Sequence, residues 1–273
     1  MRRGVRAAAV SKALPSDFPP ALLKGLHLLT REGDLNADAR RKLKQIEHLL
    51  TLLGPAVEDT LARFPEPVLV DAGAGKAYLG LLLAERCLRP AGRGRLYAVE
   101  ARPDLAARAA AVAAEAGLVQ VEMVPASIET APLPERVHLV AALHACDTAT
   151  DDALVLAIRR GADHVAVVPC CQAEVARQLQ AGGAAPEVAP LFQHAWHRRE
   201  LGAHLTNVVR ALVLEAHGYQ VTVTELAGWE HSLKNELILG RRVHRESRPA
   251  RARLTSLLET FRIRPALVRV LDG

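Results

Sequence analysis

The chain has 273 residues, and 50% of them are hydrophobic, which is enough to bury the core of one large α/β domain or of two small ones. Its net charge of +5 and its pI of about 9.3 favour a polyanionic partner such as RNA, whereas an aromatic content of 3% argues against extended base-stacking platforms. No apolar run approaches the roughly 20 residues that span a bilayer, so no membrane partner is expected.

The four cysteines do not form the pattern of a disulfide framework, because two of them, Cys170 and Cys171, are adjacent in a chain of this size. We therefore expect a reducing, cytoplasmic location. The start of the chain is basic, but its apolar stretch is too short for a secretory signal, and prolines follow at once. Residues 1–20 are expected to form a flexible basic arm.

Residues 21–64 predict a set of helices, because leucine and isoleucine recur there at spacings of three and four. The glycine-proline pair at 54–55 is expected to end one helix before a separate short helix over 56–64. Lys42 and Gln45 are expected on one exposed face, either beside a ligand or simply in solvent.

The segment from Val68 to Leu83 combines a buried strand, a glycine turn and a helix. Its first three residues are apolar, glycines stand at Gly73 and Gly75, and a helical pattern begins near Tyr78. Glycine lets the backbone turn sharply and approach a ligand closely, and the following helix N-terminus offers unpaired N–H groups. This segment therefore predicts a binding site for a polar ligand.

Two carboxylates stand at the ends of consecutive predicted strands. Asp71 ends the first strand, and the second strand, Leu96–Val99, runs directly into Glu100. A carboxylate roughly 20 to 30 residues after a glycine turn is positioned for ribose hydroxyls. An ordinary strand-turn-helix unit in which Asp71 caps the helix is the alternative.

A helix over 104–117 and a strand over 119–124 follow, and Ser127 with Ile128 occupies the loop after that strand. The fourth strand is expected over 138–143. Ligands of doubly wound sheets bind at the carboxyl ends of the strands.

Polar side chains follow the fourth and fifth strands at that edge. The fourth strand runs into His144, Cys146 and Asp147, and the fifth strand, over 162–168, is followed by Cys170 and Cys171. Because the two strands are neighbours in this type of fold, we expect these side chains to converge.

Residues 173–218 predict a helical insertion, followed by a strand over 219–225 and an antiparallel strand over 237–239. That hairpin would return Lys234 to the catalytic edge, and a short helix over 254–261 would pack on the core. The insertion could either contact RNA phosphates or form a helical cap whose basic residues face solvent. Its basic and aromatic residues are His194, Trp196, His197, Arg198, Arg199 and His204.

Four motifs appear in a characteristic order, D-A-G-A-G-K-A-Y-L, L-H-A-C-D-T-A-T-D-D, V-P-C-C-Q and H-S-L-K-N. Over roughly residues 40–245 they resemble class I methyltransferases that use S-adenosylmethionine (SAM) and carry D-x-G-x-G-K-G-x-L, L-H-x-C-G-x-x-T-D and C-C motifs. This family includes tRNA acceptor-stem 2′-O-methyltransferases, the methyltransferase domain of the glutathione-S-transferase C-terminal-domain protein, and a bacterial branch. The sequence departs from the pattern at Ala77 and Asp147, where relatives have glycine, and at Gln172, which follows the cysteines.

The resemblance implies an α/β fold with a doubly wound seven-stranded sheet of strand order 3-2-1-4-5-7-6, in which strand 7 is antiparallel. It also implies N-terminal helices, a helical insertion between strands 5 and 6, and SAM as the cofactor. The cofactor contacts it implies are Asp71, Ala72, Gly73, Ala74, Gly75, Glu100, Ala101, Ser127, Ile128 and Leu143.

Several acceptor chemistries remain open. Methyl transfer is an in-line displacement at a sulfonium, so alignment and desolvation of the acceptor supply much of the acceleration. For a ribose hydroxyl, Asp147 and Lys234 are the candidate base and cation, close to His144 in the same cluster. A carbon acceptor would require Cys146 or Cys170 as nucleophile. The Asn/Asp-Pro-Pro-aromatic turn expected for a base nitrogen is absent from the sequence.

A zinc site is another use of the same cluster, since His144, Cys146, Cys170 and Cys171 are possible tetrahedral ligands. The spacing is not C-x-x-C, and a closed site would occupy the position of the acceptor. We therefore predict no metal.

Three functions remain: a methyltransferase acting on RNA such as tRNA or rRNA, a methyltransferase acting on a protein or small molecule, and a non-catalytic SAM-fold adaptor. The net positive charge favours RNA as the substrate, and the sequence indicates no specificity for DNA. The expected organisation is a basic arm over 1–20, helices over 21–64, the SAM-binding methyltransferase domain over 65–245 and a helical tail over 246–273.

Overall fold

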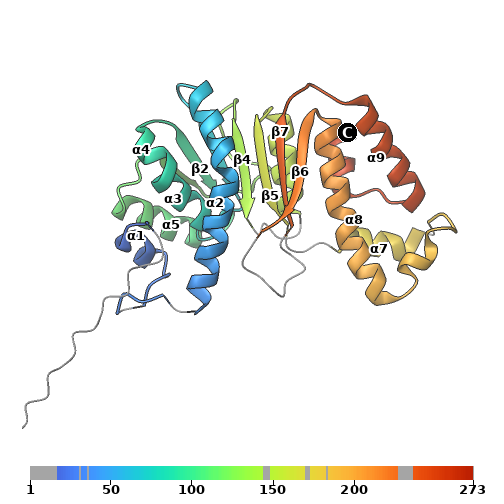
Figure 1. The fold of residues 1–273 in the computed structure, drawn as a ribbon, viewed down its shortest axis with the longest axis horizontal. Helices are drawn as coiled ribbons and strands as arrows, with labels where there is room; N and C mark the ends of the chain where they lie inside the picture. The colour runs from blue at the N-terminus through green and yellow to red at the C-terminus, as the bar shows by residue number, and fades with distance from the viewer. Residues whose placement is uncertain are drawn as a thin grey trace, which may run out of the picture.

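The computed structural model describes residues 17–30, 32–35, 37–143, 148–169, 173–182, 184–226 and 236–272. Its centre is a seven-stranded sheet of order β3-β2-β1-β4-β5-β7-β6 (Figure 1). The first five strands pair in parallel, and β7 is antiparallel to both β5 and β6. The strands are β1 Val68–Ala72, β2 Arg95–Val99, β3 Val121–Val124, β4 Leu139–Leu143, β5 His164–Val168, β6 Tyr219–Glu225 and β7 Glu236–Arg242. The predicted fold class and strand order are therefore confirmed.

Helices cover both faces of the sheet and create two hydrophobic cores. Leu69 of β1 packs in the core beneath α1, α2, α3 and α5, whereas Val70 packs in the core beneath α6, α8, α9 and α10. Successive strand residues point to opposite faces, so continuous apolar strands supply both cores. The helices are α1 Pro20–Gly25, α2 Ala37–Arg63, α3 Tyr78–Leu83, α4 Arg89–Ala91, α5 Pro103–Glu115, α6 Ala149–Arg159, α7 Glu174–Gly182, α8 Ala195–Ala216, α9 Arg248–Phe261 and α10 Ala266–Asp272.

Two short irregular helices complete the described elements, a π-helix over Ala84–Leu88 and a 3-10 helix over Ala189–Phe192. None of the described helices has the length and apolar character that crossing a membrane requires.

Helix α2 is one continuous element of 27 residues, so the prediction of a separate helix after the glycine-proline pair at 54–55 was wrong. A proline inside a helix removes one hydrogen bond and disfavours the preceding turn. The buried face of α2 nevertheless continues across the proline, from Leu49 and Leu53 to Val57, and this packing holds the helix together. Gln45 is also buried, with 3% of its surface exposed, and does not share the solvent face of Lys42.

Three further elements differ from the prediction, two in where they begin and one in being unexpected. Strand β3 begins only at Val121, because the preceding turn leaves Val119 82% exposed and outside the sheet. Helix α9 begins at Arg248, earlier than predicted, because the side chain of Ser247 accepts a hydrogen bond from the N–H of Ala250. Helix α10, which was not predicted, packs on α6.

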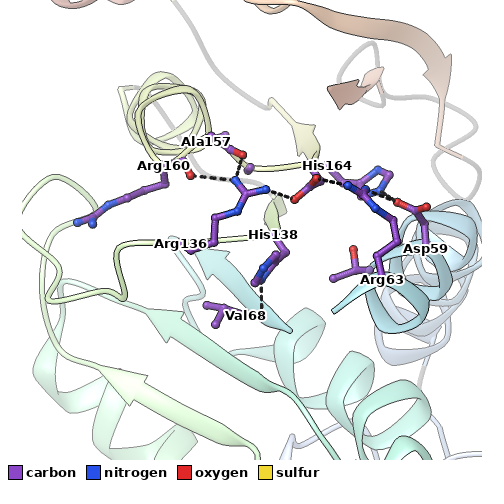
Figure 2. A network of polar contacts seen from close by, with 12 residues as sticks. Asp59, Arg63, Val68, Arg136, His138, Ala157, Arg160 and His164 are labelled. Carbon is purple, nitrogen blue, oxygen red and sulfur yellow. Dashed lines mark hydrogen bonds and ion pairs between the residues drawn. The ribbon is translucent and has the colours of Figure 1, made fainter. Parts of the chain in front are cut away.

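Ion pairs fasten α2 to the amino edge of the sheet, where β4 and β5 begin (Figure 2). The carboxylate of Asp163 accepts hydrogen bonds from Arg63 at 2.9 Å and from Arg136. The ring Nε2 of His164 lies 2.7 Å from Asp59 Oδ2, one turn before Arg63 on α2. This edge is therefore occupied by structural contacts, while the glycine turn lies at the opposite, carboxyl edge.

Candidate active site

The glycine turn at the end of β1 has the backbone geometry that a close approach to a ligand requires. Gly73 and Gly75 have φ angles of 71° and 59°, in the left-handed region. Ala77, at the position of the usual third glycine, also has a left-handed φ of 56° and is the N-cap of α3. An L-residue accepts this conformation at a cost of about 1 kcal/mol, so the departure at Ala77 preserves the shape of the turn.

Asp71 is buried beneath the turn and supports it from inside. Its Oδ2 accepts a hydrogen bond from the N–H of Gly80 at 2.9 Å, in the first turn of α3. Burial raises the pKa of Asp71 to about 7, against the lowering effect of the Gly80 hydrogen bond and with a further rise from the charge of Glu100. Asp71 therefore satisfies an N–H in the first turn of α3 from a buried position, and also places a proton-binding carboxyl under the turn.

Glu100 connects the end of β2 to the same turn. Its Oε2 accepts a hydrogen bond from the N–H of Gly75 at 2.7 Å, and its Oε1 accepts one from Arg102 Nε at 2.7 Å. Burial disfavours ionisation of Glu100, but the hydrogen bonds from Arg102 and Gly75 outweigh it and lower the pKa. The Glu100 side chain is buried, whereas that of Arg102, its ion-pair partner, is largely exposed.

The chemistry of these residues fits a SAM-like ligand, which carries a sulfonium, an ammonium group and a ribose diol. Asp71 and Glu100 supply negative charge from adjacent strands. A Cβ atom added to Gly75 would lie 3.9 Å from Arg102 Nη2 and 4.0 Å from Glu100 Oε2, so the backbone is open between these groups. The two carboxylates at this edge match the cationic and hydroxyl groups of such a ligand.

The start of α2 lies beside this turn. Lys42 of α2 and Tyr78, the first residue of α3, interact electrostatically. The Nζ of Lys42 also lies 2.7 Å from Asp38 Oδ2, and this hydrogen bond is the main reason why the pKa of Lys42 is raised. Lys42 is exposed on the solvent face of α2 and interacts with Tyr78 at the start of α3, so its expected solvent position is observed and a role beside the cofactor stays a prediction.

The remaining expected cofactor contacts follow the ends of β1 to β4. Ala72 is buried in the last position of β1, and Ala101 is exposed just after Glu100. After β3, Ile128 packs in the core, while the hydroxyl of the exposed Ser127 lies 2.7 Å from that of Thr130. Leu143 is half-buried at the end of β4 and pairs with Val168. The sheet thus brings all the ten predicted positions to its carboxyl edge, and their contact with the cofactor stays a prediction.

The predicted catalytic residues are His144, Cys146, Asp147, Cys170 and Lys234. All five lie outside the described residues, as does Cys171, so their roles also stay predictions. Within the described ranges, no group of three histidine, cysteine or acidic side chains is arranged to hold a metal ion.

Sequence reasoning missed a buried ion pair that begins four residues after Asp147. Asp151, in the first turn of α6, accepts a hydrogen bond from Arg210 Nε of α8 at 2.7 Å. The Nη1 of Arg210 donates to Asn207 at 3.0 Å, and Asn207 donates to Glu236, the first residue of β7, at 2.9 Å. Asp151 and Arg210 are 59 positions apart in the sequence, so no local pattern could have indicated their pairing.

The sheet topology, the glycine turn and the two carboxylates together define a class I SAM-dependent methyltransferase, an enzyme whose cofactor is S-adenosylmethionine. A family model described as "Methyltransferase domain" matches residues 41–178, and the chain belongs to this family. No curated protein matches the sequence.

Solved structures with a similar fold include methyltransferases of different kinds. An rRNA methylase from Streptococcus thermophilus has 14% identity and a TM-score of 0.43, over 68% of this chain and 93% of its own. A SAM-dependent methyltransferase from Aquifex aeolicus has 15% identity and a TM-score of 0.44, over 82% and 97%. A magnesium protoporphyrin IX methyltransferase from Synechocystis PCC 6803 has 13% identity and a TM-score of 0.46, over 84% and 100%.

Proposed function

We propose that this methyltransferase modifies RNA, either tRNA or rRNA. The observation that carries the proposal is that the basic starts of two helices, α2 and α8, lie toward the carboxyl edge of the sheet, the edge that holds the glycine turn. RNA carries one negative charge per nucleotide, and clustered lysine and arginine are the usual electrostatic footprint of its binding proteins.

Helix α2 supplies the first group. Its C-terminal end is fixed at the amino edge by Asp59 and Arg63, and 27 helical residues extend about 40 Å, so its first turns reach the opposite edge. Arg40 and Lys44 are exposed in these turns and form no ion pair with any residue that the structure describes. Their charges are therefore available to a polyanion.

Helix α8 supplies the second group. It ends just before β6, whose first residue Tyr219 pairs with Arg242 near the start of β5 at the amino edge. A helix of 22 residues extends about 33 Å from there, which places its N-terminal turn with Arg198 and Arg199 toward the carboxyl edge (Figure 1).

The mechanism follows from what an in-line displacement requires. Bound SAM supplies the methyl group, and the protein must hold the acceptor in line with it and exclude water. We propose that Asp147 takes the proton of the acceptor hydroxyl and that Lys234 stabilises the developing negative charge on its oxygen. The motif resemblance to tRNA acceptor-stem 2′-O-methyltransferases and their bacterial relatives supports a ribose hydroxyl as this acceptor.

The test is transfer of tritium from methyl-labelled SAM into total RNA, and separately into total protein, from a strain that lacks the gene. Label in one RNA size class supports the proposal, and nuclease mapping then identifies the atom. Label only in protein would replace RNA by a protein substrate. No label in either, with SAM binding measured by calorimetry, would leave a small molecule or an adaptor role.

The catalytic assignment needs a separate experiment on the same labelled substrate. Asp147→Ala and Lys234→Ala are expected to retain SAM affinity and to lose turnover, because both residues are assigned to the acceptor. Full turnover in both variants would contradict their assignment.

A further inference from the structure

An exposed tryptophan stands at the start of α8. Trp196 is 61% exposed and is the one exposed aromatic side chain among the described residues, while Leu191, in the preceding 3-10 helix, is 55% exposed. We call Leu191, His194, Trp196, His197 and Arg199 the Trp196 patch; all five are exposed. A chain with only 3% aromatic residues otherwise buries or half-buries its described aromatic rings, so this exposure requires a reason.

A cation covers part of the Trp196 ring. The guanidinium carbon of Arg199 lies 4.3 Å from the ring centroid, and Arg199 Nε is also 3.1 Å from Glu200 Oε1. The guanidinium group stacks on the ring by a cation–π contact and fixes its orientation. Since Trp196 as a whole remains 61% exposed with the guanidinium in place, it is accessible to a further planar group.

The surroundings of the ring favour a polyanion over an apolar protein surface. Residues 189–199 contain two arginines and two histidines and no aspartate or glutamate, and the acid that follows, Glu200, is ion-paired with Arg199. Arg198, in the first turn of α8, donates from Nη1 to the carbonyl of Phe192 at 3.4 Å and adds positive charge beside the Trp196 patch. A protein-docking surface would instead be centred on several apolar side chains with the charges at its rim.

We propose that an unpaired base of the substrate RNA stacks on Trp196, with Arg199 on the ring and the neighbouring basic side chains facing the phosphates. This inference rests on the proposed function and names the contact by which RNA is held. Stacking on an aromatic ring requires a base that is not stacked in a duplex, so the patch selects single-stranded RNA segments. Its position near the carboxyl edge holds the strand on the side of the sheet where the glycine turn lies.

The experiment uses the fluorescence of Trp196 in the full-length protein. Trp229→Phe leaves Trp196 as the only tryptophan, and this variant is titrated with a short single-stranded RNA of mixed sequence and with the same strand annealed to its complement. We expect saturable quenching by the single strand and little quenching by the duplex, because only an unpaired base reaches the ring.

Affinities for the same two RNAs are then measured for substituted proteins. Trp196→Ala should bind the single strand about 5-fold to 150-fold more weakly, the loss that corresponds to one base–aromatic stack. Trp196→Phe should bind nearly as well as the unsubstituted protein. The matched control is Val119→Ala, which shortens another exposed apolar side chain before β3 and should leave RNA affinity unchanged.

Each outcome has a distinct meaning, with SAM binding by calorimetry as the check of folding. The stacking contact would be overturned if RNA bound without quenching Trp196 fluorescence and if Trp196→Ala and Val119→Ala had the same RNA affinity. RNA would then remain the proposed substrate. Failure of the unsubstituted protein to bind either RNA, with SAM binding intact, would overturn the RNA proposal itself and this contact with it.

Discussion

The charge of Asp71 depends on the packing around it more than on its own chemistry. Burial under the glycine turn and the nearby Glu100 raise its pKa to about 7, although the N–H of Gly80 stabilises the ionised form. The cations of SAM also favour the ionised form, so cofactor binding and loss of the Asp71 proton are linked.

We expect SAM affinity to increase as the pH rises through about 7, because below that pH binding must also remove the Asp71 proton. Calorimetric titrations of the unsubstituted protein and of Asp71→Asn across this range would measure the effect. Asparagine keeps an acceptor for the N–H of Gly80 but has no proton to lose. Its affinity should be lower and should lack this dependence, and identical pH profiles for the two proteins would contradict the linkage.

Two glycines in helices allow a matched comparison. A Cβ atom at Gly80 would lie 2.9 Å from Asp71 Oδ2 and 3.0 Å from Leu96 Cδ2, whereas a Cβ at Gly54 in α2 meets nothing within 4 Å. Gly80→Ala is therefore expected to lower the free energy of unfolding by about 1–3 kcal/mol and to weaken SAM binding. Gly54→Ala should raise it by about 0.5–1 kcal/mol and leave SAM binding unchanged, as measured by urea denaturation and calorimetry.

At the scale of elements, the joint between α6 and α8 is a buried charge pair. Arg210 is only 1% exposed, and its Nη2 finds no hydrogen-bond partner in the described part of the chain. Its Nε is held by Asp151 at 2.7 Å. Removal of one member of a buried pair leaves the other charge uncompensated in a medium that solvates it poorly.

We expect Asp151→Ala to lower the free energy of unfolding by about 3–5 kcal/mol, because it leaves Arg210 buried without its carboxylate. Denaturant unfolding followed by circular dichroism would measure the loss. The control is Glu215→Ala, which removes the partner of the largely exposed Arg253 and should change stability by at most about 1 kcal/mol. Equal losses in the two variants would show that Arg210 is solvated or otherwise compensated.

At the scale of the whole molecule, the two edges of the sheet have different tasks. The amino edge is occupied by Asp163 with its two arginines and by the contact between His164 and Asp59, which fasten α2 to the sheet (Figure 2). The carboxyl edge holds the glycine turn and presents the basic starts of α2 and α8. This division predicts that basic residues at the two edges differ in their importance for RNA.

We expect Arg40→Glu with Lys44→Glu to weaken binding of total tRNA by tenfold or more, on the order of two lost phosphate contacts, and to reduce the dependence of affinity on salt. SAM affinity should stay unchanged. The control is Arg95→Glu, which reverses an exposed charge at the start of β2 on the amino edge. An equal loss of tRNA affinity in the control would mean that binding depends only on the net charge of the protein. Unchanged affinity in both variants would argue against RNA binding at α2.

Local sequence determined the strands, the glycine turn and the family of this protein. The apolar run at 68–70 and the glycines at 73 and 75 specify a strand and a turn, since backbone geometry there depends on neighbours a few residues away. For the same reason the strand Tyr219–Glu225 was predicted with its observed bounds. The predicted contacts of the cofactor followed from the resemblance of the motifs to class I methyltransferases.

The tertiary structure decided what depends on partners distant in the sequence. Packing on the sheet keeps α2 helical across Pro55, where the sequence predicted a break. The same packing buries Gln45, which the sequence predicted to be exposed. The pairing of Asp151 with Arg210 spans 59 positions, and the proton affinity of Asp71 is set by burial beneath α3. Burial and long-range pairing arise only when separate elements come together, so no stretch of sequence contains them by itself.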